Sequence, residues 1–348
     1  SDDCPWIDDS NDALLIAQQL DIPFQVIDLS AEYKERIVDY MFEEYQNGRT
    51  PNPDVLCNRE IKFDAFLKAA LELNADYVAT GHYCRKIQHD DGSFGLLTGL
   101  DPNKDQSYFL CQLNQAQLSK ALFPIGELQK EEVRKIASEN GLVTADKKDS
   151  QGLCFVGKIS LPTFLQQKLE PIQGDVVEIP RELDQFSAYQ NIAVIGDNVK
   201  ILAEPFRYTR DMGDVVTTHD GAHYYTIGQR KGLKIGGRPL PSFVIGLDVI
   251  NNIVYSGMTD EHQGLNRYAL KIELKDIHMI SSRLKIKDLN FINLNVRIRY
   301  RQSFQKGKTY LKEDGLYVLF ESIQRGITPG QFAAFYSENE LIASGVIS

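Results

Sequence analysis

The spacing of hydrophobic residues changes about halfway along this chain. In the first half, apolar residues recur every three to four positions, which is typical of amphipathic helices. The predicted helices cover residues 11–20, 31–47, 58–73, 115–121, 129–140 and 161–169. Short apolar runs at 24–29 and 76–80 predict buried strands, the second of which ends at Gly81. Helices alternating with short strands predict an α/β domain with a doubly wound parallel sheet.

After Gly174 the pattern becomes one of short alternating stretches separated by Gly, Pro, Asn and Asp, which is typical of β-structure. The clearest predicted strands are 176–179, 243–247, 294–301 and 316–320. From about residue 269, strands and turns recur as in a small barrel. At 348 residues the chain is too long for one hydrophobic core. We therefore predict an α/β domain over 1–168, a β-rich central domain over 169–268 and a C-terminal β-barrel over 269–348.

Composition adds limits on the class of protein. With 43% hydrophobic and 25% charged residues, the chain has the composition of a soluble globular protein. The Ser1-Asp2-Asp3 start has no basic region and no long apolar run follows it, so we expect a cytosolic protein without a membrane partner. Its five cysteines, at positions 4, 57, 84, 111 and 154, have no metal-ligand spacing, and we expect no metal site in this chain. The five cysteines are therefore expected to serve either thiol chemistry or packing.

The charge is unevenly distributed. The formal net charge is −10, but residues 1–50 hold twelve acidic and three basic residues, whereas residues 283–308 hold eight basic residues and one acid. Local positive potential attracts phosphate whatever the total charge is. A basic run is also typical of an ordinary solvated surface. The C-terminal region is therefore compatible with RNA binding without requiring it.

Two cysteines have chemically distinctive surroundings. A thiolate is the reactive form, and its pKa of about 8.5 falls beside Lys or Arg or at a helix N-terminus. Cys57 follows Pro51 and Pro53 and is expected just ahead of a helix, while Cys154 follows Lys147 and Lys148 in a segment rich in Ser and Gly. On spacing alone, a loop cysteine of no consequence is the better reading of Cys154. Cys4, Cys84 and Cys111 lack such a setting and are interpreted as structural.

Motifs along most of the chain resemble those of the tRNA-specific 2-thiouridylases, which exchange the C2 oxygen of the wobble uridine for sulfur. The resemblance begins with Asn52-Pro53-Asp54-Val55-Leu56-Cys57-Asn58-Arg59-Glu60-Ile61-Lys62-Phe63 and includes Lys147-Lys148-Asp149-Ser150-Gln151-Gly152-Leu153-Cys154-Phe155. The other matching blocks are Ala79 to Tyr83, Lys104 to Leu110, Phe123 to Gly126, Tyr225 to Leu233, Arg299 to Arg301 and Thr328 to Gln331. They occur in the family's order from residue 49 nearly to the C-terminus.

The resemblance implies a role for each matching residue. Cys154 would carry a persulfide, and Cys57 would attack it or close a Cys57–Cys154 disulfide as sulfur leaves. Asp54 would be the general acid/base, although from the residues alone a helix cap is the better reading of an Asp in a Pro-rich turn. Gly81 would contact ATP. The implied tRNA contacts are Asn52, Pro53, Asp54, His82, Lys104, Asp105, Gln106, Arg299, Tyr300 and Gln331.

Several expectations can be checked directly. Thiol exchange requires access, so both reactive cysteines should be exposed or mobile. A lone histidine such as His82 is more often structural than ligand-binding. Alternation along Val296 to Arg301 would place three arginines on one strand face, where they could pair with phosphate or simply be solvated. The sequence assigns no role to residues 180–212.

The implied partners are tRNA and a sulfur-relay protein or cysteine desulfurase, and the implied cofactors are ATP and Mg²⁺. The family's phosphate loop, a Ser-Gly-Gly-Val-Asp-Ser-type stretch, is expected upstream of Ser1 in a longer protein. Otherwise the chain would be a non-catalytic tRNA-binding form. Another ATP-pyrophosphatase-type ligase or amidotransferase would need no cysteine at position 154, and a thiol–disulfide oxidoreductase would be expected to carry a Cys-x-x-Cys motif, which this chain lacks.

Overall fold

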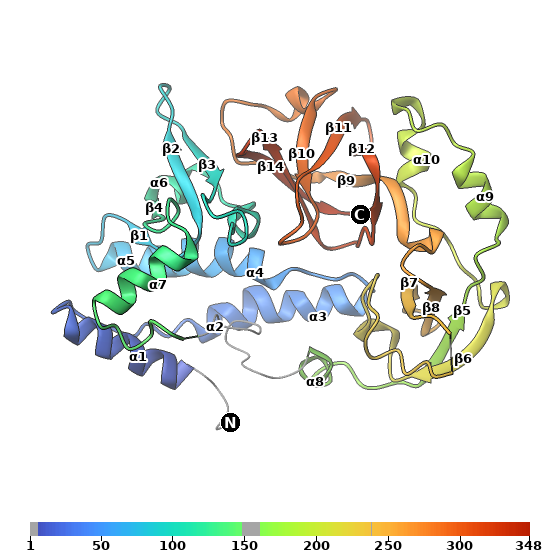
Figure 1. The fold of residues 1–348 in the computed structure, drawn as a ribbon, viewed down its shortest axis with the longest axis horizontal. Coiled ribbons are helices and arrows are strands. Elements are labelled where there is room, and N and C mark those ends of the chain that lie inside the picture. The colour runs from blue at the N-terminus through green and yellow to red at the C-terminus, as the bar shows by residue number, and fades with distance from the viewer. Residues whose placement is uncertain (1–5, 148–160, 238) are drawn as a thin grey trace.

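A computed structural model describes residues 6–147, 161–237 and 239–348, arranged as a helix-rich α/β part, a central sheet and a barrel (Figure 1). The helices of the α/β part are α1 (Trp6–Gln19), α2 (Ser30–Tyr33), the π-helix η1 (Lys34–Val38), α3 (Asp39–Gln46), α4 (Pro53–Leu56), the π-helix η2 (Cys57–Ala65), α5 (Phe66–Glu72), the 3₁₀-helix η3 (Ser107–Leu110), α6 (Gln115–Lys120), α7 (Lys130–Glu139) and α8 (Leu161–Leu165). All six predicted helices are present, with shifted ends.

The parallel sheet of the α/β part is small in the described residues. It consists of β1 (Val78–Ala79) and β4 (Ala121–Leu122), and the Thr80 amide extends the pairing to the Leu122 carbonyl at 3.0 Å. The predicted strand at 24–29 is wrong: these residues form no strand, and Phe24 and Val26 are 38% and 57% exposed. A strand needs a hydrogen-bonded neighbour, and in the described part of the chain β1 and β4 pair only with each other.

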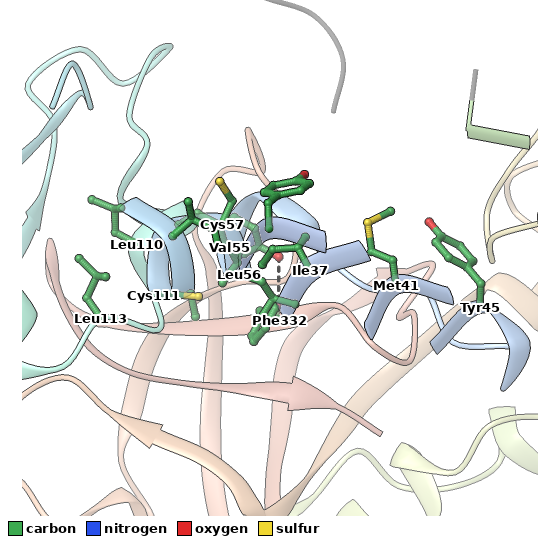
Figure 2. Packing of buried hydrophobic residues seen from close by; sticks show 14 of the residues in the cluster. Ile37, Met41, Tyr45, Val55, Leu56, Cys57, Leu110, Cys111, Leu113 and Phe332 are labelled. Carbon is green, nitrogen blue, oxygen red and sulfur yellow. Dashed lines mark hydrogen bonds between the residues drawn. The ribbon is translucent and has the colours of Figure 1, made fainter. Parts of the chain in front are cut away.

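Helices α2, η1 and α3 follow one another without a break and cover the predicted helix at 31–47. Ile37, Met41 and Tyr45 are spaced four residues apart, so they lie on one face, and all three are buried (Figure 2). The helix ends before Gly48, whose φ of +71° is easily adopted only by glycine. Apolar spacing therefore predicted this element and its end correctly.

The C-terminal part forms a closed six-stranded barrel. Its strands, in the order in which they pair, are β13 (Phe332–Ser337), β10 (Asn293–Arg297), β11 (Gln305–Lys312), β12 (Gly315–Arg325), β9 (Asn266–Met279) and β14 (Glu340–Ile347), and pairing of β13 with β14 closes the ring. A hairpin from the α/β part, β2 (Cys84–Gln88) and β3 (Phe94–Thr98), extends this sheet because Leu96 and Leu97 of β3 pair with Leu341 and Glu340 of β14. The sequence did not predict this hairpin or its attachment to the barrel.

The central sheet has four strands in the order β6 (Asp214–His219), β5 (Gly174–Glu178), β8 (Ile253–Met258) and β7 (Ser242–Asp248). Helices α9 (Asp184–Gln190) and α10 (Val199–Ala203) precede β6, and their Tyr189, Val199 and Leu202 form a buried cluster with barrel residues Tyr310 and Tyr317. Residues 180–212, to which the sequence assigned no role, thus pack a helical layer against the barrel. We propose the domain boundaries predicted above, at 168/169 and 268/269, as the division of the chain.

Candidate active site

The loop before Cys57 begins a helix earlier than expected. Asn52 caps α4 by accepting a hydrogen bond from the Val55 amide at 3.2 Å, and Pro53 occupies the first helical turn, where its missing N–H costs nothing. Cys57 therefore lies inside a continuous helical segment that runs from Pro53 to Glu72, and the prediction that it precedes the helix is wrong. It is also 1% exposed, within the core shown in Figure 2, so of the two expected properties, exposure or mobility, this thiol lacks exposure.

Asp54 is free of the capping role that the residues alone suggested, because Asn52 performs it. Burial raises the pKa of Asp54 above its ordinary value, and the positive charge of Lys62 opposes that rise. A carboxyl group with a raised pKa can hold and release a proton closer to neutral pH. Position and protonation of Asp54 are therefore suited to general acid/base chemistry three residues before Cys57.

Two further polar residues of the same helix, Asn58 and Lys62, were not among the predicted site residues. The Asn58 amide donates to the Asp54 carbonyl at 2.9 Å and to the Phe109 carbonyl at 3.2 Å. Its Oδ1 is buried and has no hydrogen-bond partner among the described residues. The spacing of four between Asp54, Asn58 and Lys62 was the available signal, since such residues share a helix face.

The barrel and the central part hold the loop that leads into α4. Gln331 donates to the Thr50 and Pro51 carbonyls at 3.0 and 3.2 Å and accepts from the Asn52 amide at 3.2 Å. The Thr50 hydroxyl donates to the Thr226 hydroxyl at 3.2 Å. Gly330 has a φ of +92°, and a Cβ there would lie 2.8 to 2.9 Å from Thr50 backbone atoms, so only glycine allows this approach. Three sequence blocks far apart in the chain thus meet around Asn52.

Gly81 and His82 follow β1 but differ in their surroundings. Gly81 is exposed, and a Cβ on it would meet only the Ile125 side chain at 4.0 Å, so a ligand could approach its backbone beyond the carboxyl end of β1. His82 is 8% exposed and lies near the rings of Phe63 and Phe123. Burial, together with the charge of Lys62, lowers the pKa of His82 to about 3, so its imidazole is neutral. The burial and the neutral imidazole favour the structural interpretation of His82, and its RNA contact stays a prediction.

The predicted tRNA contacts at 104–106 are mostly engaged within the protein. The Asp105 carboxylate is 5% exposed, accepts from the amides of Gly99 and Ser107 at 2.9 and 3.1 Å, and forms an ion pair with Arg297. Gln106 accepts from the Tyr83 amide at 3.0 Å, and Lys104 is half-buried. Asp105 therefore anchors this loop to the barrel, and its role in contacting tRNA stays a prediction.

The expected row of three arginines does not form, because β10 ends at Arg297 and the chain turns at 298–301, where Arg301 has a φ of +64°. Arg297 points inward and its guanidinium lies 4.3 Å from the Phe304 ring centroid. Arg299 is exposed and donates to the Gly326 carbonyl. The Tyr300 ring lies 4.3 Å from that of Phe109, between centroids. Of the two predicted tRNA contacts in this turn, Arg299 is exposed and Tyr300 is half-buried.

The other cysteine positions divide into two groups. Cys154 and Cys4 lie outside the described residues. Cys84 and Cys111 are fully buried, and burial raises the pKa of both thiols, to about 12 for Cys111, as expected for structural cysteines. Lys147, predicted to favour the Cys154 thiolate, instead contacts Asp9 and Asp12 at 2.6 Å each. The carboxylates of Asp9 and Asp12 in α1 therefore already balance the positive charge of Lys147.

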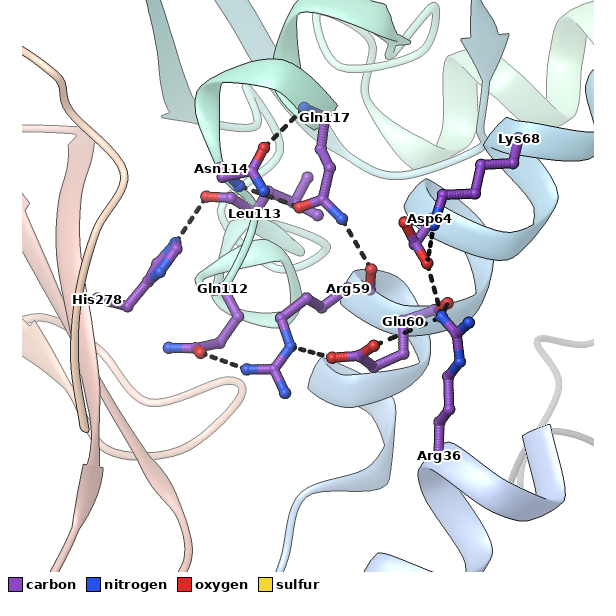
Figure 3. Close-up of polar contacts among 10 residues, drawn as sticks. All are labelled: Arg36, Arg59, Glu60, Asp64, Lys68, Gln112, Leu113, Asn114, Gln117 and His278. Carbon is purple, nitrogen blue, oxygen red and sulfur yellow. Dashed lines mark hydrogen bonds and ion pairs between the residues drawn. The ribbon is translucent and has the colours of Figure 1, made fainter. Parts of the chain in front are cut away.

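A polar network fixes η2 between its neighbours (Figure 3). Arg36 of η1 forms an ion pair with Asp64 at 2.6 Å, and Arg59 donates to Gln112 at 2.8 Å. Gln112 in turn donates to Ser344 of β14 at 2.7 Å. The helix that carries Cys57 is therefore connected directly to the N-terminal helices and, through Gln112, to the barrel.

Family models match the three parts of the chain in order. A tRNA methyl transferase HUP domain matches residues 1–158, a tRNA methyl transferase PRC-barrel domain matches 206–258, and an aminomethyltransferase beta-barrel domain matches 270–347. These matches and the observed architecture define the class: multidomain proteins that join an HUP-type α/β domain to two β-rich domains. The predicted fold class is confirmed.

Close relatives identify the family within that class. The chain is 57% identical to the tRNA-specific 2-thiouridylase MnmA of Christiangramia forsetii and 55% identical to that of Flavobacterium johnsoniae, in each case over all of this chain and 89% of the relative. It is 41% identical to the protein of the same name from Streptococcus thermophilus over 99% of this chain and 83% of the relative. The chain belongs to the family of tRNA-specific 2-thiouridylases, as its motifs predicted. None of the helices in the described ranges is long and apolar enough to cross a membrane.

Proposed function

We propose that this protein is a tRNA sulfurtransferase that replaces O2 of the wobble uridine 34 with sulfur. The observation that carries the proposal is Asp54, a carboxyl group with a raised pKa that lies three residues before Cys57. The loop leading to it is held by Gln331 of the barrel. Membership of the thiouridylase family supports the same reaction. Its tRNA substrate, and a relay protein or cysteine desulfurase as sulfur donor, are part of this proposal.

The proposed chemistry has two sulfur steps. The terminal sulfur of a Cys154 persulfide attacks C2 of the uridine, so a C–S bond forms and the activated C–O bond breaks, while Asp54 exchanges the proton at N3. The Cys57 thiolate then attacks the inner sulfur of Cys154. This releases the thiocarbonyl on the base and leaves a Cys57–Cys154 disulfide, which a thiol reductant must reduce. Since Cys57 is 1% exposed, its covering residues must move before this second step.

ATP would activate O2 of the uridine as a leaving group by adenylation. Exposed Gly81 fits a contact with the nucleotide, since only the Ile125 side chain would meet a Cβ there, at the end of β1. Mg²⁺ bound with ATP would neutralise phosphate charge in this step. Asn58 Oδ1, a buried acceptor without a described partner, could accept a hydrogen bond from the base.

The decisive experiment replaces Cys154 with Ser in the full protein, expressed in cells that lack their own copy of the gene. We expect 2-thiouridine in digested tRNA to disappear, as measured by mass spectrometry, while purified variant still binds tRNA. Cys84→Ala is the matched control, because Cys84 is buried and has no proposed chemical role, and it should retain thiolation. Full thiolation by Cys154→Ser would refute the proposed role of that residue.

The same experiment separates the rival functions. A non-catalytic tRNA-binding form would bind tRNA and produce no 2-thiouridine even without substitution. A ligase or amidotransferase that uses ammonia would be active and insensitive to Cys154→Ser. Both outcomes differ from the expected one.

A further inference from the structure

A pocket of about 460 Å³ lies where the central sheet, the segment that follows α10 and the barrel meet. This volume is within the range of small-molecule sites. Its walls are mainly apolar and aromatic, and include Phe206, Ile245, Leu247 and Tyr255. None of the predicted site residues lines it, so it is separate from the site around Cys57. Two polar groups in this pocket, Arg267 and Tyr208, lack the partners that such groups normally have.

The first is the guanidinium of Arg267. Arg267 is 7% exposed, and its described hydrogen bonds go to the Ala203 carbonyl and, at 3.3 Å, to the Ile327 carbonyl. No carboxylate lies within ion-pair distance of it in the described ranges of the chain. Burial lowers the pKa of Arg267 to about 10. Backbone carbonyls carry only partial charges, so this buried cation lacks a compensating anion.

The second is the hydroxyl of Tyr208. It is buried and has no hydrogen-bond partner among the described residues. Tyr208 and Arg267 both line this pocket, and burial raises the pKa of Tyr208. Gly264 leaves room for the hydroxyl, since a methyl group at that position would overlap it. A buried hydroxyl without a described partner and an uncompensated cation thus belong to two residues that line the same cavity.

The remaining charges of the lining leave a positive balance. Asp248 is the only acid among the lining residues, and both of its oxygens already accept hydrogen bonds from Asn251, at 2.9 and 2.8 Å. Arg207 adds a second cation at an exposed position. An anion entering the pocket would therefore meet two guanidinium groups and one acid that is already occupied.

We propose that this pocket binds a small organic anion with a flat apolar body, whose carboxylate or phosphate pairs with Arg267 and accepts a hydrogen bond from Tyr208. The aromatic and aliphatic walls enclose the body, and the anion supplies the charge that Arg267 lacks. The segment 205–208, which directly follows α10, contributes one wall and Tyr208 itself. The inference is independent of the proposed thiolation.

The test uses benzoate and phenyl phosphate as probes and uncharged benzyl alcohol as the matched neutral compound. We expect saturable binding of one or both anions to the full protein by calorimetry, with a rise in Tm, and no comparable effect of benzyl alcohol. The two anions distinguish a carboxylate site from a phosphate site. Arg267→Gln keeps hydrogen-bonding capacity but removes the charge, and should weaken anion binding about 30-fold or more.

Two tyrosine variants separate binding from stability. Tyr208→Phe should weaken anion binding about tenfold and leave Tm without the anion unchanged, because the lost hydroxyl has no described partner. Tyr189→Phe is the matched control: its hydroxyl donates to the Leu202 carbonyl at 3.1 Å and accepts from the Tyr268 amide at 2.7 Å, so it should lower Tm and leave binding intact.

The proposal is overturned if neither anion binds saturably, or if benzyl alcohol binds as well as benzoate. It is also overturned if Arg267→Gln or Tyr208→Phe binds the anions as tightly as the unmodified protein. Should Arg267→Gln fail to fold, the comparison of Tyr208→Phe with Tyr189→Phe still decides the question.

Discussion

At the scale of single residues, burial near Lys62 shifts the pKa of two titratable groups, Asp54 on the helix that starts at Pro53 and His82 after β1. Asp54 and His82 both lose hydration through burial, and the charge of Lys62 acts on both. Burial disfavours the charged form of each, so the pKa of the carboxyl rises and that of the imidazole falls. Each shift leads to a testable dependence on pH.

Replacing Asp54 with Asn should increase stability at neutral pH while reducing thiolation. The folded-state pKa of Asp54 is above its ordinary value of 3.8, so the ionised carboxylate destabilises the fold at high pH. The gain in Tm from Asp54→Asn should therefore shrink as the pH falls and vanish below 3.8, where Asp54 is protonated in both states. Thiolation should fall about 10²-fold to 10⁴-fold. Unchanged thiolation by a folded variant would exclude Asp54 as the general acid/base.

Replacing His82 with Gln should make the protein less sensitive to acid. The pKa of His82 is about 3 in the folded protein against an ordinary 6.5, so the unfolded chain binds a proton that the folded chain does not bind between these values. The stability contributed by neutral His82 is present above pH 6.5 and is lost as the pH falls toward 3. At pH 4 the loss reaches about 3 kcal/mol. Urea unfolding at pH 7 and pH 4 measures it, and identical pH dependence in both proteins would contradict this assignment.

At the scale of elements, the end of β10 is held by a buried ion pair. Arg297 pairs with Asp105, whose other bonds go to the 99–107 loop, so this pair connects the barrel with the α/β part. The hairpin β2–β3 makes a second connection through its pairing with β14. The position of the 104–106 block thus follows from anchoring to the barrel.

Asp105→Asn should destabilise the protein by about 3–5 kcal/mol, because Arg297 would be left buried and unpaired. Adding Arg297→Met should recover part of that loss. Asp101→Asn is the matched control: Asp101 is also buried, but its carboxylate accepts from the backbone amides of Asn103 and Lys130 and its replacement leaves Arg297 paired, so it should cost less. A stable Asp105→Asn variant with weakened tRNA binding would instead support the predicted RNA contact.

At the scale of the whole molecule, acidic residues are concentrated near the N-terminus and basic residues in the C-terminal part. The α/β part, the central part and the barrel nevertheless share one hydrophobic core. The largest buried cluster combines Ile37 and Cys57 of the α/β part with Tyr224 of the central part and Phe332 of the barrel. The acidic N-terminal region and the basic region around β10 belong to the same connected body (Figure 1). A net charge of −10 is therefore compatible with a basic surface for RNA.

Arg299→Ala should weaken tRNA binding and reduce the slope of log affinity against log salt concentration by about one, as expected for the loss of one phosphate contact. The measurement is a filter-binding or fluorescence titration at several salt concentrations. Lys135→Ala is the control, because Lys135 is exposed on α7 and pairs with Glu139 at 3.7 Å. Equal slopes for the Arg299 variant and the unmodified protein would show that RNA does not contact Arg299.

Local patterns predicted the elements well where the responsible forces are local. The four-residue spacing of Ile37, Met41 and Tyr45 is a property of a helix face, and it predicted the helix and its end. The strand expected at 24–29 failed because pairing depends on a neighbour that apolar spacing cannot specify. The alternation in Val296 to Arg301 failed because Arg301 adopts a left-handed turn conformation.

The amino-acid sequence alone determined the family, the order of the α/β and β-rich parts, and the short set of chemically reactive residues. Motifs and hydrophobic periodicity depend only on the order of residues, so they can be identified without the structure. Tertiary structure decided which of those residues are accessible: it buried Cys57, His82 and Asp105 and left Gly81 and Arg299 exposed. Burial depends on contacts between segments far apart in the chain, such as Gln331 with Thr50. The same long-range contacts created the Arg267 pocket, which no local pattern indicates.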